Sequence, residues 1–170
     1  MIAAAEAHPN WHRTLIILFL GQLISAVGFA SFFPFLPLYV RDLGAATSLG
    51  VDFLAGMAYS GQAFTMMLAS PIWGALADRF GRKLMLERAM FGGAVVLLLM
   101  AFARSAEELV LLRAMQGLIT GTIAAANALA AAVVPRERLG YAMGLLSVGM
   151  GSGVALGPLM GGMIADAYGY

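Results

Sequence analysis

Five long runs with few or no charges divide this sequence, and they restrict its possible folds more than any other feature. The runs cover residues 14–40, 53–77, 84–102, 109–134 and 139–165. Each is close to or above the roughly 20 residues that cross about 30 Å of hydrocarbon as a helix. Because 61% of the 170 residues are hydrophobic and only 11% are charged, a soluble globule could not hide the apolar surface. The sequence therefore predicts an all-α transmembrane protein with five membrane-spanning helices.

Positive charges are concentrated in alternate connections between these runs. Seven Lys and Arg residues lie before the first run and around the second and fourth connections, whereas the other connections hold only Arg41 and Arg104. The positive-inside rule then places the amino terminus in the cytoplasm. The first run is too long for a signal-peptide core and lacks a small-residue cleavage site, so we expect it to remain as a span.

The connection after the second run carries a dense charged pattern, Gly-x-x-x-Asp-Arg-x-Gly-Arg-Lys. Its defined positions are Gly74, Asp78, Arg79, Gly81, Arg82 and Lys83. A connection this short must be a tight turn, in which Gly81 allows a positive φ and Gly74 allows close approach of another helix. The plain alternative is a solvated, positively charged loop that only fixes orientation.

The fourth run contains an arginine well inside the predicted span. Ser105 and Glu108 have the spacing of a capping box, so a helix is expected to start there. Arg113 then lies about 8 to 9 Å into the span, a depth at which a cation is costly and suggests function. The arginine heads a polar stripe that runs down the helix within an arc of about 60° and suits a water-filled cavity: Arg113, Gln116, Thr120 and Asn127. The structural alternative is that Arg113 extends outward to Glu107 or Glu108.

The first two runs also carry polar positions. Gln22 and Ser25 share one face of the first run with Phe29, and Pro34 and Pro37 predict a kinked or unwound outer end. In the second run an arc of about 80° contains Asp52, Tyr59, Gln62 and Ser70. We expect this face to turn inward, with Asp52 itself at a helix start near the outer interface.

Glycines recur every four residues in the fifth run, at Gly149, Gly153, Gly157 and Gly161, followed by Gly162. On a helix they form a stripe without side chains, which another backbone can approach closely. Pro158 removes one backbone donor within this stretch and is expected to kink the helix. A tight packing seam with no further role is the plain alternative.

Together these patterns resemble the motifs of drug:proton antiporters, a branch of the major facilitator superfamily, in the family's order and over nearly the whole chain. The charged connection matches the superfamily's signature loop. The pattern Gly153-x-x-x-Gly157-Pro158-x-x-Gly161-Gly162 resembles the antiporter motif of the fifth span, and Gly28-x5-Pro34-x-x-Pro37 resembles a third motif. Leu109-x-x-x-Arg113-x-x-Gln116-Gly117 resembles the fourth-span motif, although Ile119 stands where a small residue is usual.

The resemblance implies a multi-pass protein of the bacterial inner membrane. Family members contain two six-helix halves, each an inverted pair of three-helix repeats. Five spans would be an incomplete amino-terminal half, so the chain is expected to be a fragment without its carboxy-terminal half. The resemblance further implies that Asp78, Arg79 and Arg82 latch the two halves, and that Arg113 takes part in proton coupling.

The implied activity of the full-length protein is efflux of hydrophobic, often cationic drugs in exchange for protons by alternating access. Its partners would be the lipid bilayer, drugs, protons and the missing half, without a cofactor, metal or nucleic acid. One departure is that family members commonly carry an acid inside the first span, where this chain has Gln22. The proton carrier would then lie in the missing half, or coupling would be absent.

The sequence also bears on two other classes of function, an enzyme and a non-transporting membrane protein. An intramembrane hydrolase would need a buried Ser-His or metal constellation, but both histidines precede the first run and the only lysine is Lys83. We therefore expect no enzyme. The remaining alternative is a non-transporting membrane scaffold, or a half-transporter that needs a partner half.

Overall fold

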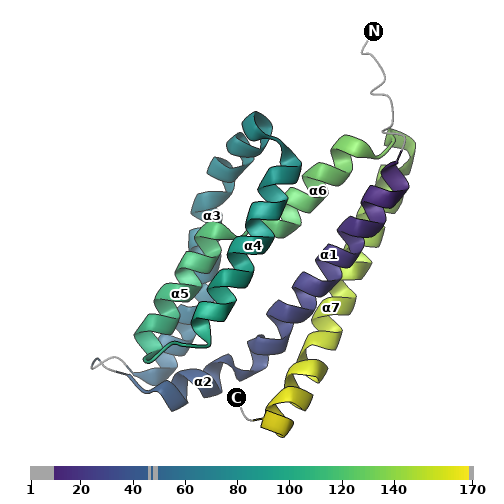
Figure 1. Ribbon diagram of the computed structural model, residues 1–170. Helices are drawn as coiled ribbons and strands as arrows, with labels where there is room; N and C mark the ends of the chain where they lie inside the picture. Colours follow the sequence, from purple (N-terminus) through teal and green to yellow (C-terminus); the bar gives the residue numbers. More distant parts are fainter. Residues whose placement is uncertain (1–9, 46, 48–49, 169–170) are drawn as a thin grey trace. The chain divides into compact units, whose positions relative to one another are not determined.

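The computed structural model describes residues 10–45, 47 and 50–168, and every regular element among them is helical (Figure 1). In chain order the elements are α1 (Trp11–Phe32), the 3-10 turn η1 (Phe33–Phe35), α2 (Leu36–Leu43), α3 (Val51–Phe80), α4 (Arg82–Met100), α5 (Ala106–Ile119), α6 (Thr122–Val133), the 3-10 turn η2 (Arg136–Arg138) and α7 (Leu139–Tyr168). The predicted all-α class is thus confirmed for the described part of the chain.

These helices form two compact units. The α1–α7 unit comprises residues up to Phe33 and from Ile123 onward, and therefore contains α1, η2, α7 and nearly all of α6. The α3–α5 unit comprises residues 34–122 and contains α2, α3, α4 and α5. The chain crosses between the units at η1 and again beside Thr122. At both places a long helical stretch is interrupted.

The interruption in the first span lies at its two prolines. Helix α1 ends at Phe32, Pro34 lies within the 3-10 turn, and Pro37 occupies the first turn of α2. Proline has no N–H group and its ring clashes with the preceding helical turn, so a pair of prolines three residues apart favours an interruption. Single prolines, Pro71 in α3 and Pro158 in α7, lie within continuous helices. The predicted loosening of the outer end of this span is confirmed.

The apolar run at residues 109–134 is also interrupted, and this break was not predicted from the sequence. Helix α5 ends at Ile119, Thr120 is extended at φ −85° and ψ 153°, and α6 starts at Thr122. Both the amide and the hydroxyl of Thr120 donate to Gln116 O, at 2.8 and 2.6 Å. Threonine and the glycine that follows it, Gly121, are both weak helix formers. The predicted stripe from Arg113 to Asn127 is therefore wrong, because no single helix carries it.

The α3–α5 unit is held by close approach of backbones. A Cβ atom added to Gly117 of α5 would overlap Gln62 O and Thr65 Oγ1 of α3, and Thr65 Oγ1 donates to Ala114 O at 2.8 Å. On α4, Gly92 has no room for a Cβ because Ile119 Cγ2 occupies the space. The large residue at position 119, unusual in the motif it belongs to, is thus accommodated by a glycine opposite it.

The α1–α7 unit uses the predicted glycine stripe as its contact. Cβ atoms added to Gly153 and Gly157 would lie 2.8 Å from Leu23 O and from Ser31 N of α1, respectively. A Cβ added to Gly149 would lie 2.9 Å from Phe19 Cδ2, and one added to Gly161 would overlap Ser31 O. The expectation that another backbone approaches this stripe is confirmed, and that backbone is α1.

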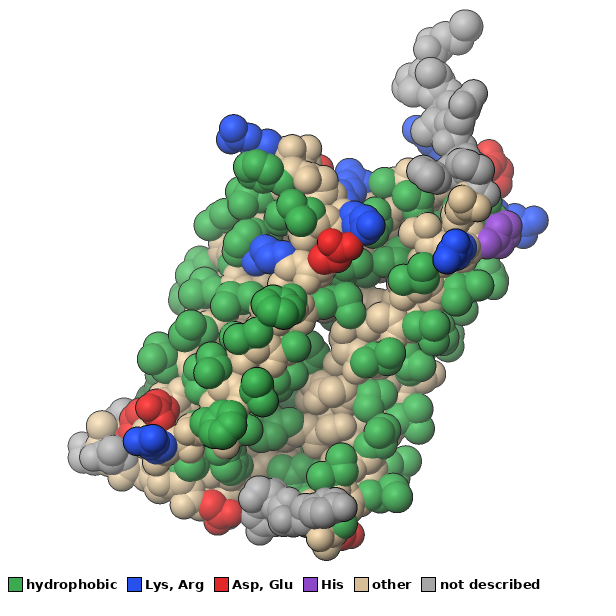
Figure 2. All heavy atoms as spheres, viewed as in Figure 1, with side chains coloured by type: hydrophobic (Ala, Val, Ile, Leu, Met, Phe, Trp, Pro, Cys, Tyr) green, Lys and Arg blue, Asp and Glu red, His purple; other side chains and the backbone are tan. Residues whose placement is uncertain are grey.

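On the face shown in Figure 2, hydrophobic side chains cover the middle of the helices, and charged side chains gather towards the helix ends. Phe91, Phe102 and Met163 are each more than 70% exposed. Three stretches of the described chain are long and apolar enough to cross a membrane: Trp11–Leu43, Ala106–Val133 and Arg136–Ala167. Helices α3 and α4 fall short of that standard, and α4 begins with four charged residues in its first seven.

Candidate functional site

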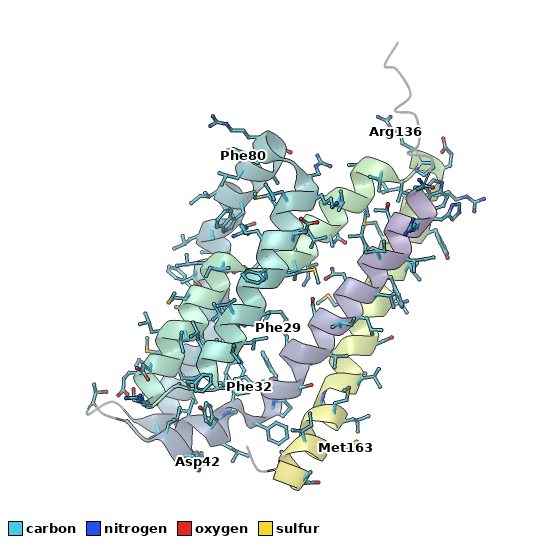
Figure 3. All side chains as sticks on the ribbon, viewed as in Figure 1. Phe29, Phe32, Asp42, Phe80, Arg136 and Met163 are labelled. Carbon is cyan, nitrogen blue, oxygen red and sulfur yellow. The ribbon has the colours of Figure 1, made fainter. Side chains whose placement is uncertain are left out.

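The charged connection is a tight turn at one end of the α3–α5 unit. Helix α3 ends at Phe80, Gly81 has φ +98°, and α4 begins at the next residue (Figure 3). Arg82 forms an ion pair with Asp78 at 3.6 Å, and the Arg79 guanidinium lies 5.3 Å from the Phe80 ring centre. The predicted positive φ at Gly81 is confirmed. No described atom lies within 4 Å of a Cβ added to Gly74, so the expected close helix approach is not made there.

Inside the same unit, Arg113 forms a buried polar cluster with side chains of α3 and α5. Its Nη1 donates to Gln62 Oε1 and to Gln116 Oε1, both at 3.0 Å. Arg113 is only 1% exposed and Gln116 is fully buried. Tyr59, one turn before Gln62 on α3, lies within electrostatic range of the guanidinium. The structure thus joins three of the predicted site residues around a buried cation.

Glu107 and Glu108, the acids towards which Arg113 could extend, accept hydrogen bonds from groups close to the start of α5. Glu108 Oε2 accepts from Arg104 N at 2.7 Å, and Ser105 Oγ accepts from Glu108 N at 3.2 Å. Glu107 Oε1 accepts from the amide and hydroxyl of Thr47 at 2.9 and 2.8 Å. The predicted helix start at Ser105 is confirmed.

The remaining polar positions do not all join the Arg113 cluster. Gln22, which is buried, and Ser25 lie on α1, and Asn127 lies on α6, so all three belong to the α1–α7 unit. Ser70 is exposed, and Asp52, in the first turn of α3, pairs with Arg41 at 3.0 Å. Of the predicted inward face of the second run, Tyr59 and Gln62 thus lie at the Arg113 cluster, whereas Ser70 does not. The helix-start role of Asp52 is confirmed.

The resembled antiporter motif divides between two sides of α7. Gly153, Gly157 and Gly161 face α1, whereas Pro158 is exposed and Gly162 has open space around it. The motif therefore combines a packed seam with a second, open side.

The contact between Trp73 and Arg88 was not predicted from the sequence. The Arg88 guanidinium lies 3.4 Å from the centre of the Trp73 ring, and Trp73 Nε1 donates to Leu118 O at 2.6 Å. The two residues are fifteen positions apart on separate helices, so no helical spacing rule connects them. The only sequence signal was an arginine one turn inside an apolar run.

Comparison with known proteins identifies relatives along nearly the whole chain. The model of the family described as Major Facilitator Superfamily matches residues 18–170. Multidrug resistance protein MdtG of Citrobacter koseri is 46% identical over 168 residues, which are 99% of this chain and 41% of that protein. MdtG of Enterobacter lignolyticus is 44% identical over 166 residues, 98% of this chain and 40% of that protein. The chain thus spans about two fifths of the length of these curated relatives.

Proposed function

The chain belongs to the major facilitator superfamily, and on that premise we propose that it is the amino-terminal part of a proton-coupled exporter of hydrophobic, often cationic drugs. The proposal is carried by the buried cation of Arg113, which α3 and α5 hold inside a helical chain whose exposed surface is apolar. A charge at such depth is costly, and in membrane proteins it marks a substrate or ion pathway. Relatives of nearly half-identical sequence are named multidrug resistance proteins.

In this proposal α3 and α4 also cross the bilayer, which gives five spans with the amino terminus in the cytoplasm. Their connection then lies inside, with its excess of Arg and Lys. The charges at the start of α4 reach the interface by extending their long side chains.

Cysteine labelling tests this topology. In cells, cysteines introduced as Arg79→Cys, Arg82→Cys or Lys83→Cys are expected to react with an impermeant thiol reagent only after the inner side is opened. Asp42→Cys is the matched control, because the exposed Asp42 lies in α2 at the other end of the same unit (Figure 3). It is expected to react from outside, and the reverse pattern would contradict the orientation.

Helices α3 and α7 share an internal repeat that indicates where the rest of a longer protein would pack. Both contain 30 residues, and a shift of 88 positions aligns three glycine pairs: Gly56 with Gly144, Gly61 with Gly149, and Gly74 with Gly162. No described atom lies within 4 Å of a Cβ added to Gly56, Gly74, Gly144 or Gly162. Stripes of small residues are contact faces between membrane helices. These open faces would receive helices of the carboxy-terminal half, and alternating access would move that half against them.

The turn between α3 and α4 would latch the two halves through Asp78, Arg79 and Arg82. Asp78→Asn is expected to abolish efflux while membrane insertion stays normal. The exposed Asp78–Arg82 pair contributes at most about 1 kcal/mol to stability, so its loss cannot prevent folding. The measurement is drug efflux from cells, normalised to the amount of inserted protein.

Glu87→Gln is the matched control for this variant. Glu87 also forms an exposed i,i+4 ion pair, with Lys83 at 3.7 Å, but it lies outside the loop motif. It should transport normally. Equal losses in both variants, or lost protein in Asp78→Asn, would favour a loop that only fixes orientation.

A chimera tests the proposed function directly. This chain replaces the matching 41% of Citrobacter koseri MdtG, and drug efflux is measured in inverted vesicles with and without a proton gradient. We expect efflux that depends on the gradient. A chimera that inserts stably but never exports drug would favour a scaffold role for this chain.

A further inference from the structure

We propose that Trp73 is a positioning residue for the interruption of the fourth span, and that Arg88 holds its indole ring in place. Its role in transport rests on the proposed function. The contact itself does not.

Trp73 donates a hydrogen bond to a backbone carbonyl at the end of α5. Because Thr120 leaves the helix, the last carbonyls of α5 lose the amide donors that a continuing helix would supply. One of them, Leu118 O, accepts instead from Trp73 Nε1 at 2.6 Å. In lipid no water can replace such a donor, so a side chain that supplies it stabilises the interrupted form of the span.

The indole ring of Trp73 is covered by the side chain of Arg88. The Arg88 guanidinium lies 3.4 Å from the ring centre, within the range of a cation–π contact. Among the described residues, Arg88 Nε is buried and has no hydrogen-bond partner, so its ring contact is the main interaction seen for it. An apolar groove of about 200 Å³ borders the contact and is lined by Leu68, Ala69, Ile72, Trp73 and Leu118. The hydrogen bond from Trp73 Nε1 is thus a specific polar link between α3 and the end of α5, in addition to the bond from Thr65 to Ala114 O one turn earlier.

The contacts of Trp73 with Arg88 and Leu118 connect the helices beside the charged turn with the end of α5. Trp73 lies five residues before Asp78, and Arg88 lies six after Arg82, so the pair joins the two helices that flank the charged turn. Leu118 is two residues from Gln116, whose Oε1 accepts from Arg113. A displacement of the turn would therefore be transmitted through Trp73 to the last turn of α5, next to the buried arginine.

The primary test is hydrogen–deuterium exchange of this chain in lipid nanodiscs. Trp73→Phe keeps an aromatic ring and removes the N–H donor. We expect amide exchange at residues 118–122 to rise about tenfold, as for a locally destabilised segment. Trp11→Phe, at the only other tryptophan, is the matched control and should leave exchange there unchanged. Unchanged exchange in Trp73→Phe would overturn the proposal.

Fluorescence tests the part assigned to Arg88. With Trp11→Phe as background, Trp73 is the only tryptophan. Arg88→Gln should roughly double the quenching of its emission by a lipid-soluble quencher, because the cation no longer covers the ring face. Arg88→Lys should restore part of the protection, and Glu87→Gln should have no effect. Equal quenching in Arg88→Gln and its background would overturn the stacking role, and this readout still decides if Trp73→Phe fails to insert.

Efflux by the chimera then tests positioning against plain stability. Trp73→Phe should lower the maximal rate several-fold at equal protein level, with the drug KM nearly unchanged, since Trp73 lies outside the Arg113 cluster. Faster exchange with normal efflux would overturn the positioning role. If the unmodified chimera does not transport, the proposed function fails, whereas the exchange result still decides the contact.

Discussion

Replacing Gly157 by leucine is expected to separate α7 from α1. A Cβ at this position would already overlap the Ala30 side chain and lie 2.8 Å from Ser31 N, so a leucine has no space to occupy without moving the α1 backbone. We expect the free energy of unfolding to fall by at least about 3 kcal/mol, the upper end of typical overpacking penalties. Thermal unfolding of the purified chain in mild detergent measures the effect, and in the chimera drug efflux should be lost.

Gly162→Leu is the matched control, five residues further along the same helix. No described atom lies within 4 Å of a Cβ added there, so the chain alone should keep its unfolding midpoint. In the chimera, however, Gly162→Leu should reduce efflux, because the open side of α7 is proposed to receive the other half of the transporter. An unfolding midpoint for Gly157→Leu equal to that of the unchanged chain would show that the seam does not hold the unit together. Normal efflux by the Gly162→Leu chimera would show that the open side receives nothing.

Replacing Arg113 by alanine is expected to abolish proton-coupled efflux, with a loss of at least tenfold, or about 1.4 kcal/mol. The guanidinium bridges Gln62 and Gln116 in a buried position, so its removal takes away both the charge and the link between α3 and α5. Since Arg stays protonated in proteins, its part would be to lower the pKa of a neighbouring acid from the other half. Efflux driven by an imposed proton gradient in inverted vesicles measures the effect.

Arg113→Lys separates charge from geometry. An ammonium group keeps the charge but ends a shorter side chain and lacks the guanidinium's planar arrangement of donors, so partial efflux is expected. Arg104→Ala is the matched control, because Arg104 is exposed at the start of the same span and should not affect transport. Normal gradient-driven efflux in Arg113→Ala would show that the arginine serves only packing or extends to the interface.

Local rules account for much of what the sequence predicted correctly. The proline pair marked the interruption between α1 and α2, the Ser105–Glu108 spacing marked the start of α5, and Gly81 marked a turn with positive φ. Each depends on backbone chemistry within a few residues, which the order of amino acids states directly. The glycine stripe of α7 was equally visible, because a period of four residues needs no knowledge of the partner helix.

The predicted polar stripe was wrong because it assumed that one helix continues through Thr120. A polar arc from Arg113 to Asn127 exists only if the helix continues, and α5 ends where Thr120 becomes extended. The low helix propensity of Thr120 and Gly121 is a weak, local preference that tertiary contacts must support. The polar arc of α3 shows a related limit. An angular arc says which residues share a side of a helix, but not which of them contact another helix, and here Gln62 bonds Arg113 whereas Ser70 is exposed.

The sequence by itself thus determined the all-helical, lipid-facing character of the chain, its turns, and the positions where backbones can meet. Only the tertiary structure decided that the glycine stripe of α7 meets α1, that Arg113 bonds Gln62 of α3, and that Trp73 supplies a donor to the end of α5. The physical reason is that hydropathy, capping and glycine conformation act within a few residues. Partner choice depends on which helices lie side by side, and that is fixed by contacts between segments 45 to 130 residues apart, from Trp73 with Leu118 to Phe19 with Gly149.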